Sequence, residues 1–252
     1  MNQKFTNENI WIIGASSGIG MELALYLSNN GANIIVSSRS EKSLQKIIRQ
    51  TGGKNDLILP IDIKNSKEVK NAVSQITQKF SKLDRVIFMA GIYEPAACNK
   101  MKIKQAHDII DINFKGAINI LHYCLPLLEK QLKSQLVLCA SVAGYSGLPN
   151  GQPYSATKSA IINLAESLKS EYANSNLDIK VINPGFVSTR LTKKNNFKMP
   201  FIIEPEEAAK EICKNLNSKS FEIHFPKKTT IILKFLRFLP YSLYFWIVSK
   251  VL

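Results

Sequence analysis

The stretch Ile13–Gly20, IGASSGIG, lies between an apolar run and a helical pattern. Glycines in such a turn free the backbone of Cβ atoms, so that main-chain amides can approach a phosphate at a helix N-terminus. In an α/β sheet, the first strand-to-helix turn is where a dinucleotide binds. An ordinary glycine-rich turn is the alternative. We expect a pyrophosphate-binding loop formed by Gly14, Ser16, Ser17, Gly18, Ile19 and Gly20.

Apolar runs of strand length alternate with helical patterns along the chain. The expected strands are Ile10–Ile13, Asn33–Val36, Asp56–Leu59, Arg85–Met89, Gln135–Ala140, Ile179–Ile182 and Phe221–Ile223. The expected helices are Ile19–Asn29, Glu41–Gln50, Ser66–Phe80, a long stretch Ile103–Lys130, Tyr154–Tyr172 and Pro205–Asn215. This alternation predicts an α/β fold, a Rossmann-like doubly wound sheet of about seven mainly parallel strands with helices on both faces.

Composition limits the possible partners. The chain has 252 residues, 45% of them hydrophobic, and a formal net charge of +14. A phosphorylated ligand or an anionic membrane would balance this charge, and a solvated lysine-rich surface is the plain alternative. The lysines are scattered and no basic block carries interleaved aromatics, so we expect no nucleic-acid partner.

The cysteines indicate a reducing compartment and no metal. They form no CxxC pair and show no ligand spacing with the histidines. The N-terminal MNQKFTNENI lacks the apolar core of a secretion signal, which favours a cytoplasmic protein. We expect reduced, mostly buried thiols at Cys98, Cys124, Cys139 and Cys213.

The end of the second expected strand favours NADP over NAD. Folds of this kind usually place an acid there to hold the ribose of NAD. This chain instead has VSSRSEK, in which Ser38 and Arg39 suit a 2′-phosphate, although Arg39 is also compatible with a solvated arginine. After the third strand, Asp62 and Ile63 are placed to contact the adenine, and Asp62 alone is equally compatible with a turn cap.

The stretch NGQPYSATKSA, Asn150–Ala160, places Tyr154 and Lys158 four residues apart. Residues at this spacing share a helix face. A cation beside a phenol favours the phenolate and lowers its pKa from about 10. A chance pair on a surface helix has the same spacing, so the interpretation depends on the rest of the chain.

Further motifs follow the glycine loop in order: DINFKG with Asn113, CASVAGYSG with Ser141, YSATK, and NPGFVST at Asn183–Thr189. Together they resemble the short-chain dehydrogenase/reductase family, in its single-domain branch, from Asn9 to about Phe225. The resemblance implies a catalytic set of Asn113, Ser141, Tyr154 and Lys158. It further implies cofactor contacts from Ala90, Gly91, Tyr154, Lys158, Pro184, Gly185, Val187 and Thr189.

In that family the tyrosine protonates the carbonyl oxygen during reduction. The resemblance implies this role for Tyr154, while Lys158 would lower its pKa and hold the nicotinamide ribose. Ser141 would hydrogen-bond and polarise the substrate oxygen. Asn113 would hold a water that connects Lys158 to solvent.

The chain departs from the family at two positions. The family commonly has Thr where this chain has Ile13, and Asn-Asn-Ala-Gly where it has FMAG, Phe88–Gly91. Replacing both polar partners of an interaction by apolar groups can leave stability nearly unchanged, whereas replacing one leaves the other buried without a hydrogen-bond partner. We expect apolar packing there and an intact cofactor cleft, with cofactor affinity left open.

The expected function is NADP(H)-dependent interconversion of a carbonyl and an alcohol. The segment RLTKKNNFKMPFIIE, before Pro205, is basic and apolar and favours a hydrophobic or acyl-chain substrate. The alternative is a non-catalytic NADP-binding sensor or a membrane-associated scaffold. Apolar residues on several sides of the stretches Ile103–Lys130 and Tyr154–Tyr172 favour a homodimer or homotetramer.

We expect residues 1–225 to form the Rossmann-fold oxidoreductase domain and residues 226–252 a hydrophobic, cationic helical extension. The extension, Pro226–Leu252, carries five Lys or Arg and no acid. Its longest uncharged stretch has 12 residues, whereas a membrane-spanning helix needs about 20. A cationic, aromatic-rich segment suits the inner face of a membrane. Packing on the core, on a partner subunit or over the substrate mouth are the alternatives.

Overall fold

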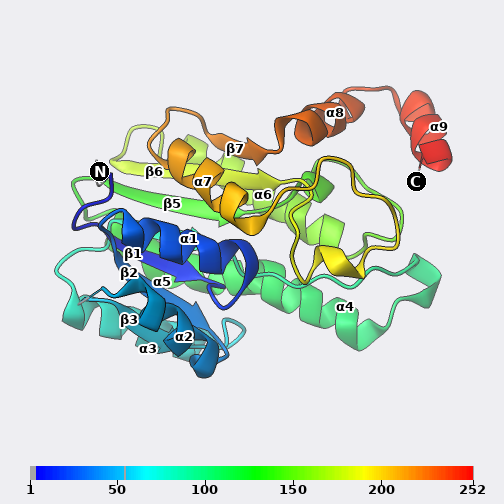
Figure 1. The fold of residues 1–252 in the computed structure, drawn as a ribbon. Coiled ribbons are helices and arrows are strands. Elements are labelled where there is room, and N and C mark those ends of the chain that lie inside the picture. The colour runs from blue at the N-terminus through cyan, green and yellow to red at the C-terminus, as the bar shows by residue number, and fades with distance from the viewer. Residues whose placement is uncertain (1–3, 54, 252) are drawn as a thin grey trace.

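The strands pair in parallel to form a seven-stranded sheet in the computed structural model, which describes residues 4–53 and 55–251. The order is β3-β2-β1-β4-β5-β6-β7 (Figure 1). The strands are β1 (Asn9–Ile13), β2 (Asn33–Ser38), β3 (Leu57–Pro60), β4 (Arg85–Phe88), β5 (Ser134–Cys139), β6 (Leu177–Pro184) and β7 (Glu222–Phe225). The order reverses between β1 and β4, which opens a crevice at the carboxyl ends of these strands.

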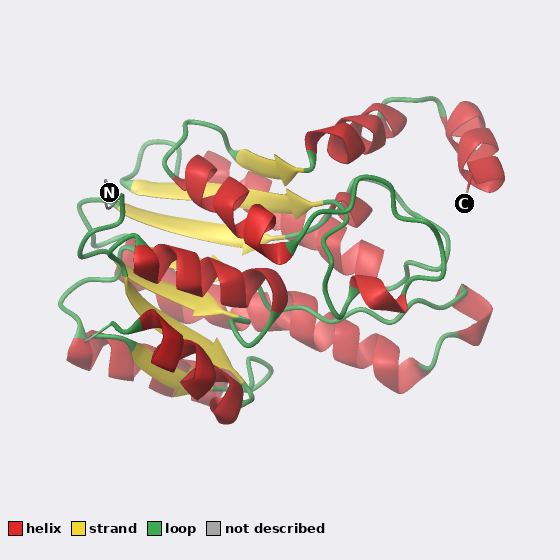
Figure 2. Ribbon diagram, viewed as in Figure 1, coloured by secondary structure: helices red, strands yellow, loops and turns green. Residues whose placement is uncertain are grey.

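Helices cover both faces of the sheet (Figure 2). The main helices are α1 (Gly18–Asn29), α2 (Glu41–Thr51), α3 (Ser66–Lys79), α4 (Ile103–Ile110), α5 (Gly116–Leu128), α6 (Tyr154–Glu171) and α7 (Pro205–Leu216). Buried residues of α1, α2 and α7 form one core, and those of α3, α5 and α6 form the other. Alternate residues of β1 enter opposite cores, Trp11 one and Ile12 the other. The predicted doubly wound fold is therefore confirmed.

Most predicted boundaries lie within a residue or two of the observed ones, and the long helical stretch holds the main difference. It contains a π-helical turn, Asp111–Lys115, between α4 and α5. Such a turn inserts an extra residue and often marks a functional position. The turn includes Asn113, whose side chain is fully buried.

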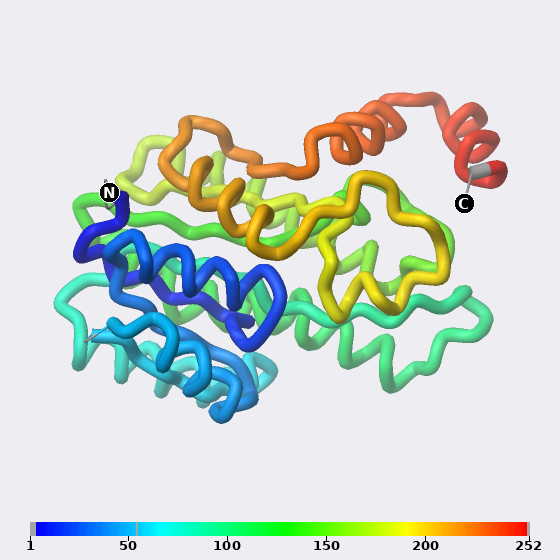
Figure 3. The backbone as a smooth tube through the Cα atoms, in the orientation of Figure 1, coloured from blue at the N-terminus to red at the C-terminus, as the bar shows by residue number. Residues whose placement is uncertain are grey.

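Two further helices follow the edge strand β7: α8 (Lys227–Arg237) and α9 (Tyr241–Val251). They form the orange-to-red end of the tube, beyond the end of β7 (Figure 3). In α8, Thr229 and Thr230 are buried, and Thr230 Oγ1 lies 2.6 Å from Nδ1 of His224 on β7. Within residues 4–53 and 55–251, no helix is long and apolar enough to cross a membrane.

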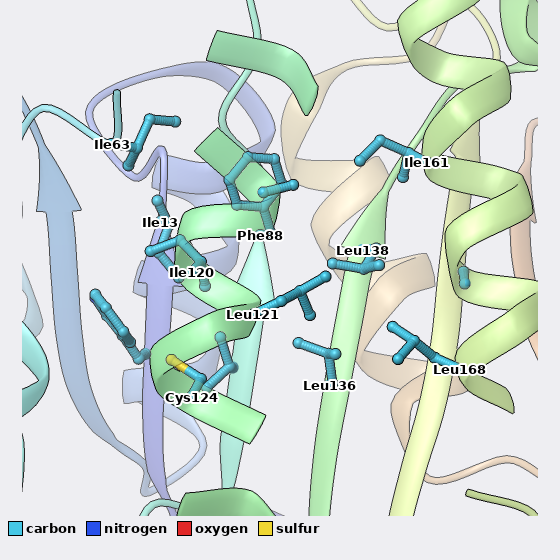
Figure 4. Close-up of a cluster of buried hydrophobic side chains, with 14 of the residues drawn as sticks. Ile13, Ile63, Phe88, Ile120, Leu121, Cys124, Leu136, Leu138, Ile161 and Leu168 are labelled. Atoms are coloured by element: carbon cyan, nitrogen blue, oxygen red, sulfur yellow. The ribbon is translucent and has the colours of Figure 1, made fainter. Parts of the chain in front are cut away.

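The two departures from the family pattern meet in the core. Ile13 and Phe88 are register partners at the ends of β1 and β4, and both side chains are fully buried. They belong to the cluster shown in Figure 4, where Ile63 lies nearby. Apolar packing therefore occupies the place where the family commonly has polar residues, directly beneath the crevice.

Truncating the Phe88 side chain should destabilise the folded protein. We expect Phe88→Ala to lower the free energy of unfolding by about 3–5 kcal/mol, because it removes a buried ring and leaves a cavity. Urea denaturation of both proteins measures the change. The control is Leu132→Ala between α5 and β5, whose side chain is 94% exposed and which should change stability by less than about 0.5 kcal/mol. Equal effects of the two substitutions would contradict this account of the core.

Candidate active site

A cleft of about 690 Å³ lies at the carboxyl ends of the strands, beside the point where the strand order reverses. Every residue predicted to contact a cofactor lines this one cleft. From the glycine loop and the ends of β2 and β3 these are Gly14, Ser16, Ser17, Gly18, Ile19, Gly20, Ser38, Arg39, Asp62 and Ile63. From the segments after β4 and β6 and from α6 they are Ala90, Gly91, Tyr154, Lys158, Pro184, Gly185, Val187 and Thr189.

Gly14 and Gly20 of the glycine loop lie too close to neighbouring backbone atoms to carry a side chain. Gly14 has a positive φ of 93°, and a Cβ atom there would lie 2.6 Å from the backbone nitrogen of Ala90. A Cβ atom on Gly20 would lie 2.4 Å from the carbonyl oxygen of Gly14. This packing directs the start of α1 at the cleft. Within the described chain, the α1 N-cap Ser17 makes no side-chain capping bond and the first turn holds no acid, so its amides are available to an anion.

The charge of the cleft suits a phosphorylated ligand. Among the described lining residues, Asp62 is the one carboxylate, and the cations are Arg39, Lys158, Arg190 and Lys194. The sequence did not lead us to Arg190, which follows the NPGFVST motif directly. Its Nη2 donates a hydrogen bond of 2.6 Å to Oγ of Ser17, so a guanidinium reaches the glycine loop from the opposite wall. Together the cations and the free helix amides fit a dinucleotide.

The residues predicted to bind the adenosine end of the cofactor differ in whether their side chains already have partners within the protein. Arg39 is exposed at the wall, where it can reach a ligand. Ser38 Oγ already accepts a hydrogen bond from the backbone amide of Ser40, at 3.2 Å. Asp62 acts as a turn cap, because its Oδ1 accepts from the backbone amide of Lys64 at 3.0 Å. The capping alternative for Asp62 is therefore what the structure shows, and an adenine contact remains a prediction.

Ser141, Tyr154 and Lys158 meet at the other end of the cleft. Ser141 follows β5, and Tyr154 begins α6 with Lys158 one turn later. The Ser141 hydroxyl lies close enough to the half-buried phenol of Tyr154 to affect its pKa, and it donates to the Pro184 carbonyl oxygen at 3.5 Å. Lys158 Nζ lies 5.6 Å from the centroid of the Tyr154 ring and donates to the carbonyl oxygen of Cys139 at 2.8 Å.

Burial shifts the pKa values of both Tyr154 and Lys158. Desolvation raises the pKa of Tyr154 above its ordinary value, and the nearby Ser141 hydroxyl opposes this only in part. Burial likewise lowers the pKa of Lys158, with the nearby Cys139 opposing. Desolvation of the phenol therefore dominates its pKa in this arrangement, and the lowering of that pKa by Lys158 stays a prediction. The phenol is a protonated acid at neutral pH.

Asn113 lies behind the cleft rather than in its wall. Its Oδ1 accepts from the backbone amide of Ile92 at 2.8 Å, and its Nδ2 donates to the Ile92 carbonyl at 3.0 Å and to Thr157 Oγ1 at 3.2 Å. A Cβ atom on Gly91 would lie 3.4 Å from both Asn113 Oδ1 and Lys158 Nζ. Asn113 thus fixes the segment after β4 against α6, and the predicted water-mediated role stays a prediction.

The substrate side contains residues that no motif marked. The Tyr93 ring packs on Tyr154 with centroids 4.8 Å apart, and its hydroxyl donates to Asn195 Oδ1 at 3.0 Å. Lys194 Nζ donates to the Tyr93 carbonyl oxygen at 3.0 Å. The segment after β6, residues 190–204, therefore contacts Tyr93, which in turn packs on Tyr154. The sequence signals for these contacts are weak, since Tyr93 merely follows the FMAG stretch.

Comparison with known proteins agrees with this architecture. The chain is 28% identical over 235 residues to an uncharacterised oxidoreductase of Myxococcus xanthus, covering 92% of this chain and 93% of that protein. It is 29% identical over 185 residues to a 3-oxoacyl-[acyl-carrier-protein] reductase of Thermotoga maritima, covering 73% and 75%. The crystal structure of gox2181 superposes with a TM-score of 0.76 at 20% identity, covering 83% of this chain and 88% of that one, which shows a shared fold.

The family-level match decides the assignment. Residues 8–200, most of the chain, match the model of the family described as short chain dehydrogenase. This stretch includes the glycine loop, the π turn and the Tyr154 and Lys158 helix. The chain belongs to the short-chain dehydrogenase family of oxidoreductases.

Proposed function

We propose that the protein is an NADP(H)-dependent oxidoreductase that interconverts a carbonyl and an alcohol. The observation that carries the proposal is the convergence of Ser141, Tyr154 and Lys158 at the inner end of a cation-rich cleft. We assign this activity to residues 1–225 and treat residues 226–252 as an extension of that domain.

When bound, the nicotinamide cofactor would supply or accept the hydride. The protein's own task is to position the carbonyl and to supply the proton. Tyr154 donates its phenolic proton to the carbonyl oxygen as negative charge develops there, and Ser141 hydrogen-bonds the same oxygen. Lys158, oriented by the Cys139 carbonyl, would hold the ribose hydroxyls of the bound cofactor with its remaining N–H groups. An ordinary phenol is already in its acid form at neutral pH, and the raised pKa of Tyr154 keeps it so, so the proton is present for donation to the carbonyl oxygen.

Removing the phenolic hydroxyl should abolish the chemistry and spare cofactor binding. We expect Tyr154→Phe to lower kcat by at least about 100-fold, the smaller end of a general-acid contribution. The measurements are NADPH oxidation over a panel of aldehydes and ketones, and NADPH affinity by fluorescence. The matched control is Tyr172→Phe at the far end of α6, which should retain turnover. Full turnover in Tyr154→Phe would contradict the mechanism.

The same panel separates the enzyme from the alternative, a non-catalytic NADP-binding sensor or scaffold. Wild-type protein that binds NADPH but oxidises none of it over the panel would support the sensor. The proximity of Ser141 to Tyr154 and the buried Lys158 support the enzyme, since cofactor binding alone does not require an acid at this place.

We assign the cofactor preference to Arg39. It is an exposed guanidinium at the adenosine wall, and the residues that follow β2 directly, Arg39 and Ser40, include no acid. A hydrogen bond to a charged group contributes about 1.5–3 kcal/mol, so Arg39→Ala should lower kcat/KM for NADPH by about 10- to 100-fold and leave that for NADH nearly unchanged. Arg49→Ala, another exposed arginine near the end of α2, is the control. A wild-type preference for NADH would overturn this assignment.

For the substrate we propose a hydrophobic or acyl-chain carbonyl compound. We call residues 190–204 the substrate-side segment. It exposes Phe197, Phe201 and Ile202 beside its lysines. The relative from Thermotoga maritima is named as a reductase of 3-oxoacyl groups on a carrier protein, which supports an acyl chain here.

Chain length tests this substrate class. With a homologous series of 3-oxoacyl thioesters, kcat/KM should rise by up to about fourfold for each added methylene, because burying one contributes about 0.8 kcal/mol. Small polar ketones serve as the comparison. A flat profile, or better turnover of the polar ketones, would exclude the acyl-chain proposal.

We propose a cytoplasmic homodimer or homotetramer. Exposed apolar side chains on α4 and α5 support association, namely Ile103, Ile110 and Ile118. The relation of the protein to the inner face of the membrane depends on the contacts of α8 and α9.

A further inference from the structure

Helices α8 and α9 expose a large apolar surface. We call it the tail surface, and its members are Ile231, Ile232, Phe235, Phe238, Tyr241, Leu243, Phe245 and Trp246. Phe238 is 82% exposed and Tyr241 80%. Contiguous apolar patches of this kind on a soluble domain mark an interaction site. Figure 1 shows both helices projecting beyond the end of β7.

The outward orientation of these side chains is fixed by contacts on the opposite faces of the two helices. In α8, Lys234 Nζ pairs with Glu222 of β7 and lies 5.8 Å from the centroid of the Tyr145 ring. In α9, Tyr244 is 6% exposed, and its hydroxyl donates to the carbonyl oxygen of Gly147. Each helix therefore packs one face against the domain, and the side chains of the tail surface lie on its other faces.

The charge around the tail surface identifies its partner. Lys227, Lys228, Arg237 and Lys250 are exposed, and Lys250 Nζ lies 4.7 Å from the centroid of the Trp246 ring. The sequence from Pro226 onward contains no Asp or Glu. A second copy docked on the same face would bring cations against cations with no carboxylate between them. Anionic lipid headgroups would neutralise them while the aromatic side chains enter the interface.

The tail surface continues into the substrate-side segment. Lys228 Nζ lies 5.4 Å from the centroid of the Phe201 ring, and Thr229 Oγ1 donates to the Pro200 carbonyl oxygen at 3.5 Å. Phe201 is itself 49% exposed and Ile202 42%. The same segment begins at the cleft wall with Arg190 and Lys194. Helix α8 therefore contacts the same segment whose first residues line the cleft.

We propose that the tail surface binds an anionic phospholipid bilayer at its interface and places the substrate-side segment against the lipid. An amphiphilic carbonyl compound then enters the cleft from the membrane. The lipid-binding part stands alone, whereas the entry route rests on the proposed oxidoreductase function.

The test of binding is co-flotation of the full-length protein with vesicles. Wild-type protein should float with phosphatidylglycerol/phosphatidylcholine vesicles, release as NaCl is raised, and bind pure phosphatidylcholine at least about tenfold more weakly. The variant Phe235→Glu/Phe238→Glu/Trp246→Glu should lose at least about tenfold in vesicle affinity. The matched control is Leu132→Glu, a 94% exposed leucine between α5 and β5, which should bind as wild type. Thermal unfolding and NADPH binding check that each variant folds.

Several results would overturn the proposal. Wild-type protein that stays unbound at low salt would do so, as would equal binding by the triple variant. Light scattering, which measures the oligomeric state, gives a further test. If wild type is an oligomer that does not bind vesicles and the triple variant is a monomer, the tail surface is a contact between copies of the chain.

The entry route has its own readout. A carbonyl amphiphile embedded in anionic vesicles should be reduced at least about tenfold more slowly by the triple variant, while a short soluble ketone is turned over as by wild type. Equal rates on the embedded substrate would refute the entry route and leave lipid binding intact. Absence of turnover on both substrates by wild type would instead refute the proposed oxidoreductase.

Discussion

The close contact between the β1–α1 turn and the chain leaving β4 governs the carboxyl edge of the sheet. Gly14 meets the backbone of Ala90 so closely that a Cβ atom would stand 2.6 Å from its nitrogen. With these segments in contact, α1 turns to one face of the sheet while α5 and α6 cover the other, and the cleft lies between. The apolar pair Ile13 and Phe88 supports the contact from below. The family's polar residues are thus dispensable for the shape of the site.

Burial is the second constraint, and it acts on both the phenol and the ammonium. Tyr154 and Lys158 are each pushed toward their neutral forms, as expected when charged groups lose water. The ammonium satisfies part of its hydrogen-bonding capacity with the Cys139 carbonyl. Asn113, fully buried, ties Ile92 to Thr157 of α6. The Tyr154 and Lys158 side chains therefore stand on elements held in place by packing and hydrogen bonds, an arrangement that suits the proposed catalysis.

The fold was predictable because local periodicity and tertiary burial agree. Isolated apolar runs became buried parallel strands, and the motif residues came together because parallel strands present their carboxyl ends at one edge. The direction of the Tyr154 pKa was not predictable, because spacing reports on the neighbouring cation and says nothing of desolvation. Tyr93 and Arg190 were missed for a related reason. Their partners, Tyr154 and Ser17, lie far away in sequence, and no short motif encodes either contact.

The π turn at Asp111–Lys115 also changes how the sequence around it should be interpreted. One extra residue advances the angular phase of a helix by about 100°. A single helical wheel drawn through Ile103–Lys130 therefore superimposes two stripes, one belonging to α4 and the other to α5. Part of the apolar character on several sides of this stretch is a consequence of that offset. Removing one residue from the turn would bring the stripes into line and rotate Asn113 away from Ile92, at the cost of the clamp that holds the chain beside Lys158.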